Sequence, residues 1–204
     1  MPGPTKTLVI ATHNRKKAGE MVTILSRRFP QLELLTLADF EGAPEPEETG
    51  STYPENAAIK SESAAAFTGE WSLADDAGLE IDRLDGAPGL YSKRFGGEDL
   101  PFPEKMAKIL SLLAGEGSRR ARFRCCVALT SPTGETKIFE ATCEGAIAQA
   151  PSGGGGFGYD PIFLPDDADG RTMADLTADE KHRISHRGKV LAMVGDYLEA
   201  DGTL

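Results

Sequence analysis

The fold of this chain is decided by the stretch Leu73-Ala74-Asp75-Asp76-Ala77-Gly78-Leu79-Glu80-Ile81. The apolar run from Trp71 to Ala74 predicts a buried strand that leads into two adjacent carboxylates. Because Asp is a poor strand residue, we expect the strand to stop at these carboxylates. Gly78 would then allow a sharp turn before a second strand-like run from Leu79 to Leu84.

The adjacent carboxylates of Asp75 and Asp76 repel each other unless cations or hydrogen bonds compensate them. Hard divalent cations such as Mg²⁺ take carboxylate oxygens, usually one or two from the protein and the rest from water and phosphate. A polar turn between two strands would have the same sequence, so the pair alone leaves both a metal site and a simple turn open.

Composition narrows the class of protein. The chain has 204 residues, of which 40% are hydrophobic and 26% charged, enough for one large globular domain or two lobes that share a core. Its formal net charge of -10 excludes non-specific binding to duplex nucleic acid, which needs an excess of Lys and Arg. A phosphate substrate would therefore have to be held by local basic residues or by a metal ion.

The cysteines and the hydropathy indicate a cytoplasmic protein that does not bind membranes. Cys125, Cys126 and Cys143 all fall in strand-like runs, and an odd number of apolar-strand cysteines favours reduced core thiols over a disulfide framework. No stretch approaches 18 apolar residues, and the N-terminal residues lack the apolar segment of a signal peptide.

A strand, a polar turn and a helix open the chain. Thr7 to Ala11 is the continuous apolar run of a buried strand, and apolar residues recur at helical spacing from Ala18 to Phe29. The turn between them consists of Thr12, His13, Asn14, Arg15, Lys16 and Lys17. A helix N-terminus with three basic residues is an anion site. Equally, Asn14 could simply cap the helix while the lysines face solvent.

The rest of the chain alternates helices and strands. A strand is expected over Leu32 to Leu35, and capping boxes at Thr52–Glu55 and Thr177–Glu180 open two helices. The first of these is Ala-rich, runs to about Thr68 and carries Lys60; the second carries Lys181. Further elements are a helix around residues 106–113, a probable hairpin of residues 123–129 and 137–147, a break at 185–188, and a final helix over 190–198.

Two polar loops remain ambiguous from the residues alone. Residues 153–158 satisfy G-x-G-x-x-G, but no strand–turn–helix context surrounds them, which excludes a dinucleotide fingerprint. Linkers rarely contain aromatics, so Phe157 or Tyr159 could stack on a planar ring. His186 and Arg187 lie at the predicted break between helices, where capping and solvated charge are equally reasonable.

Together these motifs resemble one family over nearly the whole chain, the inosine triphosphate pyrophosphatases, which hydrolyse non-standard purine nucleoside triphosphates. The resemblance is carried, in order, by Ala11-Thr12-His13-Asn14 through Lys17, Glu47-Glu48-Thr49-Gly50, Glu55-Asn56-Ala57 through Lys60, Ala74 to Leu79, Gly86-Ala87-Pro88-Gly89 through Phe95, Gly156 to Pro161, and Ile184-Ser185-His186-Arg187-Gly188.

The resemblance implies an α/β fold, with a long mixed central β-sheet flanked by helices and two lobes with an active-site cleft between them. It implies that residues 1–204 form a single two-lobed domain, that the protein is a homodimer, and that Mg²⁺ is the cofactor. It also implies roles: Thr12 to Lys17 would cradle the triphosphate and Lys60 would touch it. Asp76 would be catalytic and bind the metal with Glu48 and Asp75. Phe157, Gly158, Tyr159, Asp160, Lys181, His186 and Arg187 would enclose the base.

The chain departs from the family pattern at His13, Lys16 and Ala77, where Gly, Gly and Ser are usual. A bulky residue at position 16 indicates that the local backbone avoids positive φ. Ala77 can contribute only backbone contacts to the substrate. Arg187 carries only hydrogen-bond donors, which suits the C6 oxygen of hypoxanthine and xanthine and leaves the amino group of adenine unpaired.

Two other functions stay open. The chain could be a septum-formation-type pyrophosphatase, which has a similar two-lobed fold and acts on pyrimidine or modified nucleotides. It could also be a nucleotide-binding sensor that lost turnover through the three departures from the family pattern. The Ser-His-Arg block argues against the first alternative, and the intact carboxylates argue against the second.

Overall fold

The computed structural model describes residues 6–115 and 117–202. Its strands are β1 (Thr7–Ile10), β2 (Glu33–Thr36), β3 (Trp71–Ile81), β4 (Arg120–Thr130), β5 (Thr136–Ile147) and β6 (Phe163–Pro165). Its α-helices are α1 (Arg15–Arg28), α2 (Tyr53–Thr68), α3 (Phe102–Leu112), α4 (Ala178–Ile184) and α5 (His186–Asp201). Short 3₁₀ turns cover Leu37–Asp39, Asp82–Leu84, Gly89–Tyr91, Asp160–Ile162 and Met173–Asp175.

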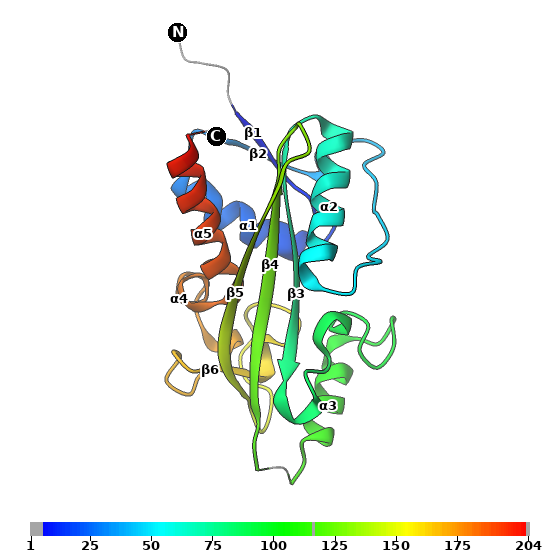
Figure 1. The fold of residues 1–204 in the computed structure, drawn as a ribbon. Helices are drawn as coiled ribbons and strands as arrows, with labels where there is room; N and C mark the ends of the chain where they lie inside the picture. Colours follow the sequence, from blue (N-terminus) through cyan, green and yellow to red (C-terminus); the bar gives the residue numbers. More distant parts are fainter. Residues whose placement is uncertain (1–5, 116, 203–204) are drawn as a thin grey trace. The chain divides into compact units, whose positions relative to one another are not determined.

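The strands form one mixed sheet in the order β2-β1-β3-β4-β5-β6 (Figure 1). β1 is parallel to both β2 and β3, and β5 is antiparallel to β6. β4 and β5 are neighbours joined by a tight turn, in which the Ser131 amide donates to the Glu135 carbonyl at 2.9 Å. The mixed α/β sheet flanked by helices confirms the fold class that the sequence predicted.

The chain forms two compact units, and β3, β4 and β5 contribute residues to both. Unit 1 comprises the chain up to Asp76, Cys125–Glu140 and the chain from Val190 onward. Unit 2 comprises Ala77–Arg124 and Ala141–Lys189. Within the described residues, no helix has the length and apolar character needed to cross a membrane.

The first three strands determine where α1 and α2 lie in unit 1. The chain leaves β1 through α1 to reach β2, and then returns through α2 to β3 on the other side of β1. Parallel crossovers are right-handed, so two crossovers that run in opposite directions along the sheet put their helices on opposite faces. Figure 1 shows α1 and α2 on the two sides of these strands.

One sequence prediction about β3 is wrong. Asp75 and Asp76 do not end a strand, and Gly78 does not begin a turn, because β3 runs without interruption from Trp71 to Ile81. The chain turns only afterwards, at Asp82–Leu84. The low strand propensity of Asp is overridden here by polar partners on both faces of the strand, described below.

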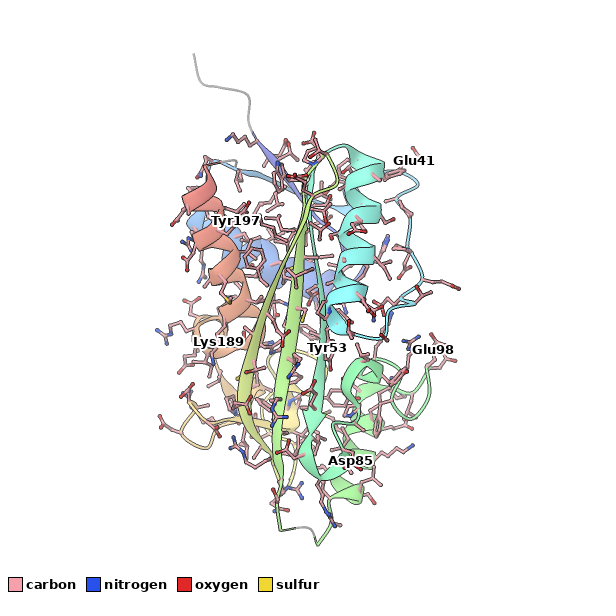
Figure 2. All side chains as sticks on the ribbon, in the orientation of Figure 1. Glu41, Tyr53, Asp85, Glu98, Lys189 and Tyr197 are labelled. Carbon is pink, nitrogen blue, oxygen red and sulfur yellow. The ribbon has the colours of Figure 1, made fainter. Side chains whose placement is uncertain are left out.

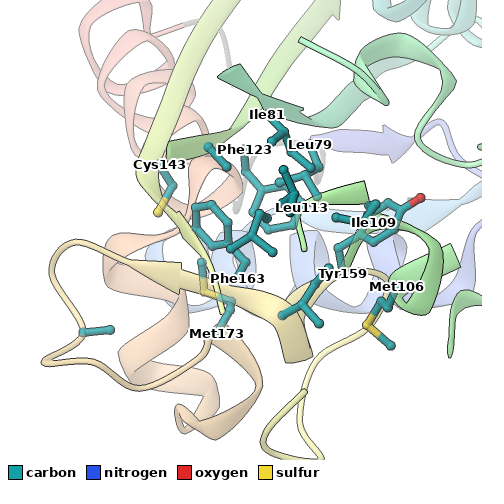
Figure 3. Packing of buried hydrophobic residues seen from close by; sticks show 14 of the residues in the cluster. Leu79, Ile81, Met106, Ile109, Leu113, Phe123, Cys143, Tyr159, Phe163 and Met173 are labelled. Carbon is teal, nitrogen blue, oxygen red and sulfur yellow. The ribbon is translucent and has the colours of Figure 1, made fainter. Parts of the chain in front are cut away.

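Each unit has its own apolar core. In unit 1, one face of β1 and β3 packs against α2 and against the 3₁₀ turn that follows β2. The buried residues of this core are Val9, Ala11, Leu37, Ala64 and Ala74. A core in unit 2 joins β3, α3, β4, β5 and β6, and Figure 3 shows Leu79, Ile109 and Phe163 among its buried residues. Cys125, Cys126 and Cys143 are buried and reduced, as the sequence predicted.

The last two helices meet at one residue. The sequence predicted a break over residues 185–188, but only Ser185 separates α4 from α5, and its hydroxyl accepts a hydrogen bond from the Gly188 amide at 3.1 Å. His186 and Arg187 therefore lie in the first turn of α5. Figure 2 labels Lys189 near the start of this helix and Tyr197 near its end, where the Tyr197 ring packs against Phe139 at 5.7 Å.

Candidate functional site

Asp75 and Asp76 lie level with the turn that follows β1. The Ala11 amide donates to the Leu73 carbonyl at 2.7 Å, so the next residues of β3 run alongside Thr12 and Asn14. Ligands of α/β sheets gather where neighbouring crossovers leave a strand in opposite directions, which is the carboxyl end of β1 in this sheet.

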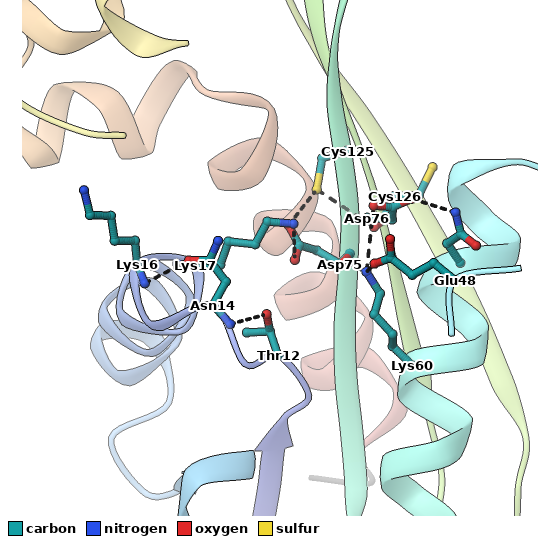
Figure 4. A network of polar contacts seen from close by, with 11 residues as sticks. Thr12, Asn14, Lys16, Lys17, Glu48, Lys60, Asp75, Asp76, Cys125 and Cys126 are labelled. Atoms are coloured by element: carbon teal, nitrogen blue, oxygen red, sulfur yellow. Dashed lines mark hydrogen bonds and ion pairs between the residues drawn. The ribbon is translucent and has the colours of Figure 1, made fainter. Parts of the chain in front are cut away.

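Alternation along β3 separates the two carboxylates. Successive side chains of a strand point to opposite faces, so Asp75 faces α1 and Asp76 faces α2. Figure 4 shows Lys17 and Lys60 approaching the β3 ribbon from its two sides. Each carboxylate thus has its own cation, and the repulsion expected of adjacent acids is relieved without a turn.

Asp75 is bound on the α1 side. Its Oδ1 atom lies 3.2 Å from Nζ of Lys17, and the carboxylate is fully buried. On the same side the thiol of Cys125 donates to Oδ2 at a distance of 3.9 Å. Asp75 therefore holds the lysine of the basic turn in place.

Asp76 is bound on the α2 side by two residues one helical turn apart. Asn56 Nδ2 donates to Oδ2 at 3.2 Å, and Lys60 Nζ lies 3.8 Å from Oδ1. Lys60 also donates to the Asp75 carbonyl at 2.7 Å and to Glu48 Oε1 at 2.9 Å. Glu48 and Asp76 are thereby joined through one ammonium group.

Burial sets the protonation of this cluster. It raises the pKa of Asp76, because loss of solvent outweighs the attraction of Lys60 and Lys17. Burial also lowers the pKa of Lys60, but the attraction of Asp76, Asp75 and Glu48 is stronger, and the net shift of that pKa is upward. Lys60 stays charged, whereas Asp76 is a stronger base than an exposed aspartate.

The basic turn combines both interpretations that its sequence left open. Asn14 caps α1: its Oδ1 atom accepts from the Lys16 and Lys17 amides at 3.1 and 3.2 Å. Thr12 Oγ1 accepts from the Asn14 amide at 3.2 Å. His13, Arg15 and Lys16 are exposed, so three basic side chains remain open to solvent beside the buried Lys17–Asp75 pair.

The backbone of this turn agrees with the departures from the family pattern. Lys16 adopts helical geometry in α1, so the bulky residue at this position meets no requirement for positive φ. His13 Nε2 lies 3.4 Å from the carbonyl oxygen of Pro44, which links the turn to the acidic loop before α2.

A second polar cluster lies in unit 2, around Asp160. Its Oδ2 atom accepts from the Phe157 amide at 2.8 Å and from Lys181 Nζ at 2.7 Å. Lys181 Nζ lies 4.9 Å, and Arg187 Cζ 5.6 Å, from the centre of the Phe157 ring. Asp160, Lys181 and Arg187 are all buried, while the Phe157 ring is partly exposed.

Tyr159 and His186 are both core residues in the structure. Tyr159 belongs to the core: its hydroxyl donates to the Ser92 carbonyl at 2.8 Å and its ring meets Phe102 edge-on. Phe157 is left as the aromatic that can meet a planar ligand. His186 is not a surface residue, because it is buried and stacks on Phe123 at 4.7 Å.

Sequence reasoning missed one residue. Asn56 is 3% exposed and hydrogen-bonds to Asp76, yet it was noted only as part of the Glu55-Asn56-Ala57 block. Its spacing of four residues from Lys60 was the available signal, because residues i and i+4 of a helix share a face.

The model of the Ham1 family matches residues 8–197. The chain belongs to the Ham1 family. This confirms the resemblance found in the sequence.

Individual relatives of the Ham1 family cover nearly the full length. A protein from Exiguobacterium named dITP/XTP pyrophosphatase is 47% identical over 184 residues, 90% of this chain and 92% of that one. A protein of the same name from Bacillus subtilis is 46% identical over 197 residues, 96% of this chain and 98% of that one. The structure of a HAM1 protein from Coxiella burnetii superposes with a TM-score of 0.85 at 39% identity, covering 96% and 99% of the two chains.

Proposed function

We propose that this chain hydrolyses dITP, ITP and XTP to the nucleoside monophosphate and pyrophosphate. Its class is that of a nucleoside triphosphate pyrophosphatase, a hydrolase of phosphoanhydride bonds, as its membership of the Ham1 family and its 46–47% identical relatives indicate. The choice of these purine nucleotides within that class is supported by the names of the relatives and by the donors around Asp160.

One observation carries the proposal: two adjacent buried carboxylates are each paired with a lysine at the end of β1. Cleavage of a phosphoanhydride depends mainly on positioning and on neutralising charge, and it needs no covalent nucleophile. Lys17 and Lys60 supply fixed positive charge, and the exposed side chains of Arg15 and Lys16 in the turn add to it.

We assign Asp76 as the group that takes the proton of the attacking water. The water oxygen bonds to phosphorus, the phosphoanhydride bond breaks, and pyrophosphate leaves. A carboxylate whose pKa is raised by burial is better matched to this role near neutral pH than an exposed one. Asp75 lies on the opposite face of β3 from Asp76 and pairs with Lys17. Its role in this proposal is to orient that lysine, not the water.

We propose that the reaction uses Mg²⁺. Among the described residues, no three acidic, His or Cys side chains are arranged to hold a metal by themselves. Magnesium usually takes one or two carboxylates and completes its shell with substrate phosphates and water. Asp76 and Glu48, which share Lys60, fit that partial donor set. When bound, the ion would neutralise phosphate charge and lower the pKa of water.

We propose that the base is recognised in unit 2. The ring of Phe157 is partly exposed and offers an aromatic surface, and the Lys181 ammonium and the Arg187 guanidinium bring donors over that ring. Arginine cannot accept a hydrogen bond, so it favours a C6 oxygen over the amino group of adenine. A buried polar site that is left unpaired by the wrong substrate can discriminate by roughly 10⁴-fold.

The resemblance also implies an assembly, and we propose a cytoplasmic homodimer. The three buried, reduced cysteines support a reducing compartment. Light scattering after gel filtration tests the assembly: a mass equal to a single chain would reject the dimer.

A nucleotide panel tests the proposed function. Pyrophosphate release would be measured for dITP, ITP, XTP, dATP, dGTP, dTTP and UTP, with Mg²⁺ and with excess chelator. We expect dITP, ITP and XTP to be preferred, with loss of turnover on chelation and in Asp76→Asn. A preference for dTTP or UTP would instead favour the septum-formation type, and tight dITP binding without product would identify a sensor.

A further inference from the structure

The side-chain amide of Asn56 connects two parts of unit 1 that are far apart in sequence. Its Oδ1 atom accepts from the Gly50 amide at 2.8 Å, and its Nδ2 group donates to Asp76 Oδ2 at 3.2 Å. The Gly50 amide is a donor and the Asp76 carboxylate an acceptor, so only this orientation of the amide satisfies both. Asn56 is 3% exposed, its hydrogen bond to Asp76 is buried, and its hydrogen bond from the Gly50 amide is partly buried.

These contacts complete a closed ring of interactions. Asn56 and Lys60 lie four residues apart on α2 and bind the two different oxygens of Asp76. Lys60 continues to Glu48, and Glu48 lies two residues before Gly50, whose amide returns to Asn56. The acidic loop and the carboxylate of β3 are thus fixed to the same face of one helix.

The loop approaches this helix as closely as its backbone allows. A Cβ atom at Gly50 would lie 2.6 Å from Asn56 Oδ1 and 2.7 Å from Glu55 Cβ, closer than real Cβ atoms come. Only a residue without a side chain therefore lets the loop reach the amide of Asn56. The close approach is a steric feature beside the hydrogen bonds, and it includes Glu55 Cβ as well as Asn56 Oδ1.

We propose that Asn56 is a positioning residue for the reaction, which sets the orientation of the Asp76 carboxylate and holds the Glu48 loop against it. The inference rests on the proposed function, because it takes Asp76 as the group that acts on water. Asn56 acts through its hydrogen bond to Asp76, so its removal lowers turnover more than it weakens substrate binding. Outer partners of this kind typically contribute about 10- to 100-fold to activity.

Two substitutions of similar size distinguish the hydrogen bond to Asp76 from the hydrogen bond with the Gly50 amide. Asn56→Asp keeps an oxygen for the Gly50 amide but cannot donate to Asp76, whereas Asn56→Leu loses both hydrogen bonds. We expect kcat for dITP to fall by about 10- to 100-fold in both variants, with KM changed by less than about threefold. Hydrogen exchange of the Gly50 amide should stay slow in Asn56→Asp and become fast in Asn56→Leu.

Ser61→Ala serves as the matched control. Ser61 lies on the same helix, is fully buried and shares a 2.7 Å hydrogen bond with Thr130, but it contacts none of the carboxylates of the ring. We expect this variant to lower Tm while kcat stays within about twofold of the wild type. Any effect of helix destabilisation alone would thus appear in the control.

The outcomes distinguish the two proposals. If wild type and Ser61→Ala hydrolyse dITP and the Asn56 variants keep their kcat, the positioning role is wrong while the proposed function stands. If a lower kcat is accompanied by an equal rise in KM, Asn56 contributes to binding and the inference is again wrong. A wild-type chain that releases no pyrophosphate from any nucleotide overturns the proposed function itself.

Discussion

Asp75 and Asp76 are neighbours in β3, yet their carboxylates leave the strand on opposite faces and bind lysines from different helices. Lys17 belongs to α1 and Lys60 to α2, and the two crossovers of the sheet place these helices on the two sides of β3. The dipeptide therefore has a different cationic partner on each face of the strand. It divides into one residue that holds a lysine and one that is joined to Glu48.

This division predicts unequal effects of two isosteric substitutions. Asp76→Asn should reduce kcat for dITP by about 10³-fold or more, because it removes the group that accepts the proton. Asp75→Asn should cost less, about 10- to 100-fold, because it weakens only the hold on Lys17. Pyrophosphate release under saturating dITP measures both. Equal losses in the two variants would argue against separate roles.

The division also shows what sequence could predict in this region. Apolar runs and periodicity indicate β1, α1 and β2, and the capping boxes at Thr52 and Thr177 correctly mark the starts of α2 and α4. The propensity of Asp wrongly ended β3, because propensity does not register Lys17, Lys60 and Asn56, which reach the strand from helices distant in sequence. Tertiary partners decided the local structure here.

The second cluster shows the same limit. Only the family resemblance points to Asp160, Lys181 and Arg187 as site residues. The residues alone are equally compatible with capping and with solvated charge at His186 and Arg187. Burial of His186 against Phe123 and of Arg187 beside Phe157 depends on α5 starting directly after Ser185. A single-residue break with extended backbone cannot be distinguished from a longer loop by composition alone.

The buried ion pair of unit 2 provides a stability prediction. Asp160 and Lys181 lie 2.7 Å apart, with side chains 5% and 7% exposed. Asp160→Ala would leave a buried ammonium without its carboxylate, which typically costs about 3–5 kcal/mol. Replacing both residues, in Asp160→Ala/Lys181→Met, should recover part of that loss. Urea unfolding of the two single variants and the double variant measures the coupling, and strict additivity would contradict the pair.

The capping box of α4 predicts a pH-dependent stability. Hydrogen bonds from Arg171 and from Thr177 lower the pKa of Glu180 from 4.5 to about 2. A group whose pKa is lower in the folded state stabilises fully above its unfolded pKa, and this contribution is lost as pH falls. The Tm difference between wild type and Glu180→Gln should thus be largest above about pH 5 and vanish towards pH 2.

The buried thiols predict a chemical reactivity. Burial raises the pKa of Cys143 to about 11, so almost no thiolate is present at pH 8. Cys125 and Cys126 are fully buried. We expect none of these thiols to react with iodoacetamide in the native protein, and all three to react in urea, as read by mass spectrometry. Rapid native labelling of Cys143 would show that its strand opens.

Two helical glycines predict stability changes of opposite sign. A Cβ atom at Gly19 in α1 would meet nothing within 4 Å, so Gly19→Ala should stabilise the protein by about 0.5–1 kcal/mol through helix propensity and a lower unfolded-state entropy. A Cβ atom at Gly188 in α5 would overlap the His182 carbonyl oxygen. Gly188→Ala should therefore push α5 away from α4 and lower Tm, although helix propensity alone predicts a rise. Thermal unfolding of the two variants measures both changes. A rise in Tm for Gly188→Ala would contradict the close packing of Gly188 against the His182 carbonyl.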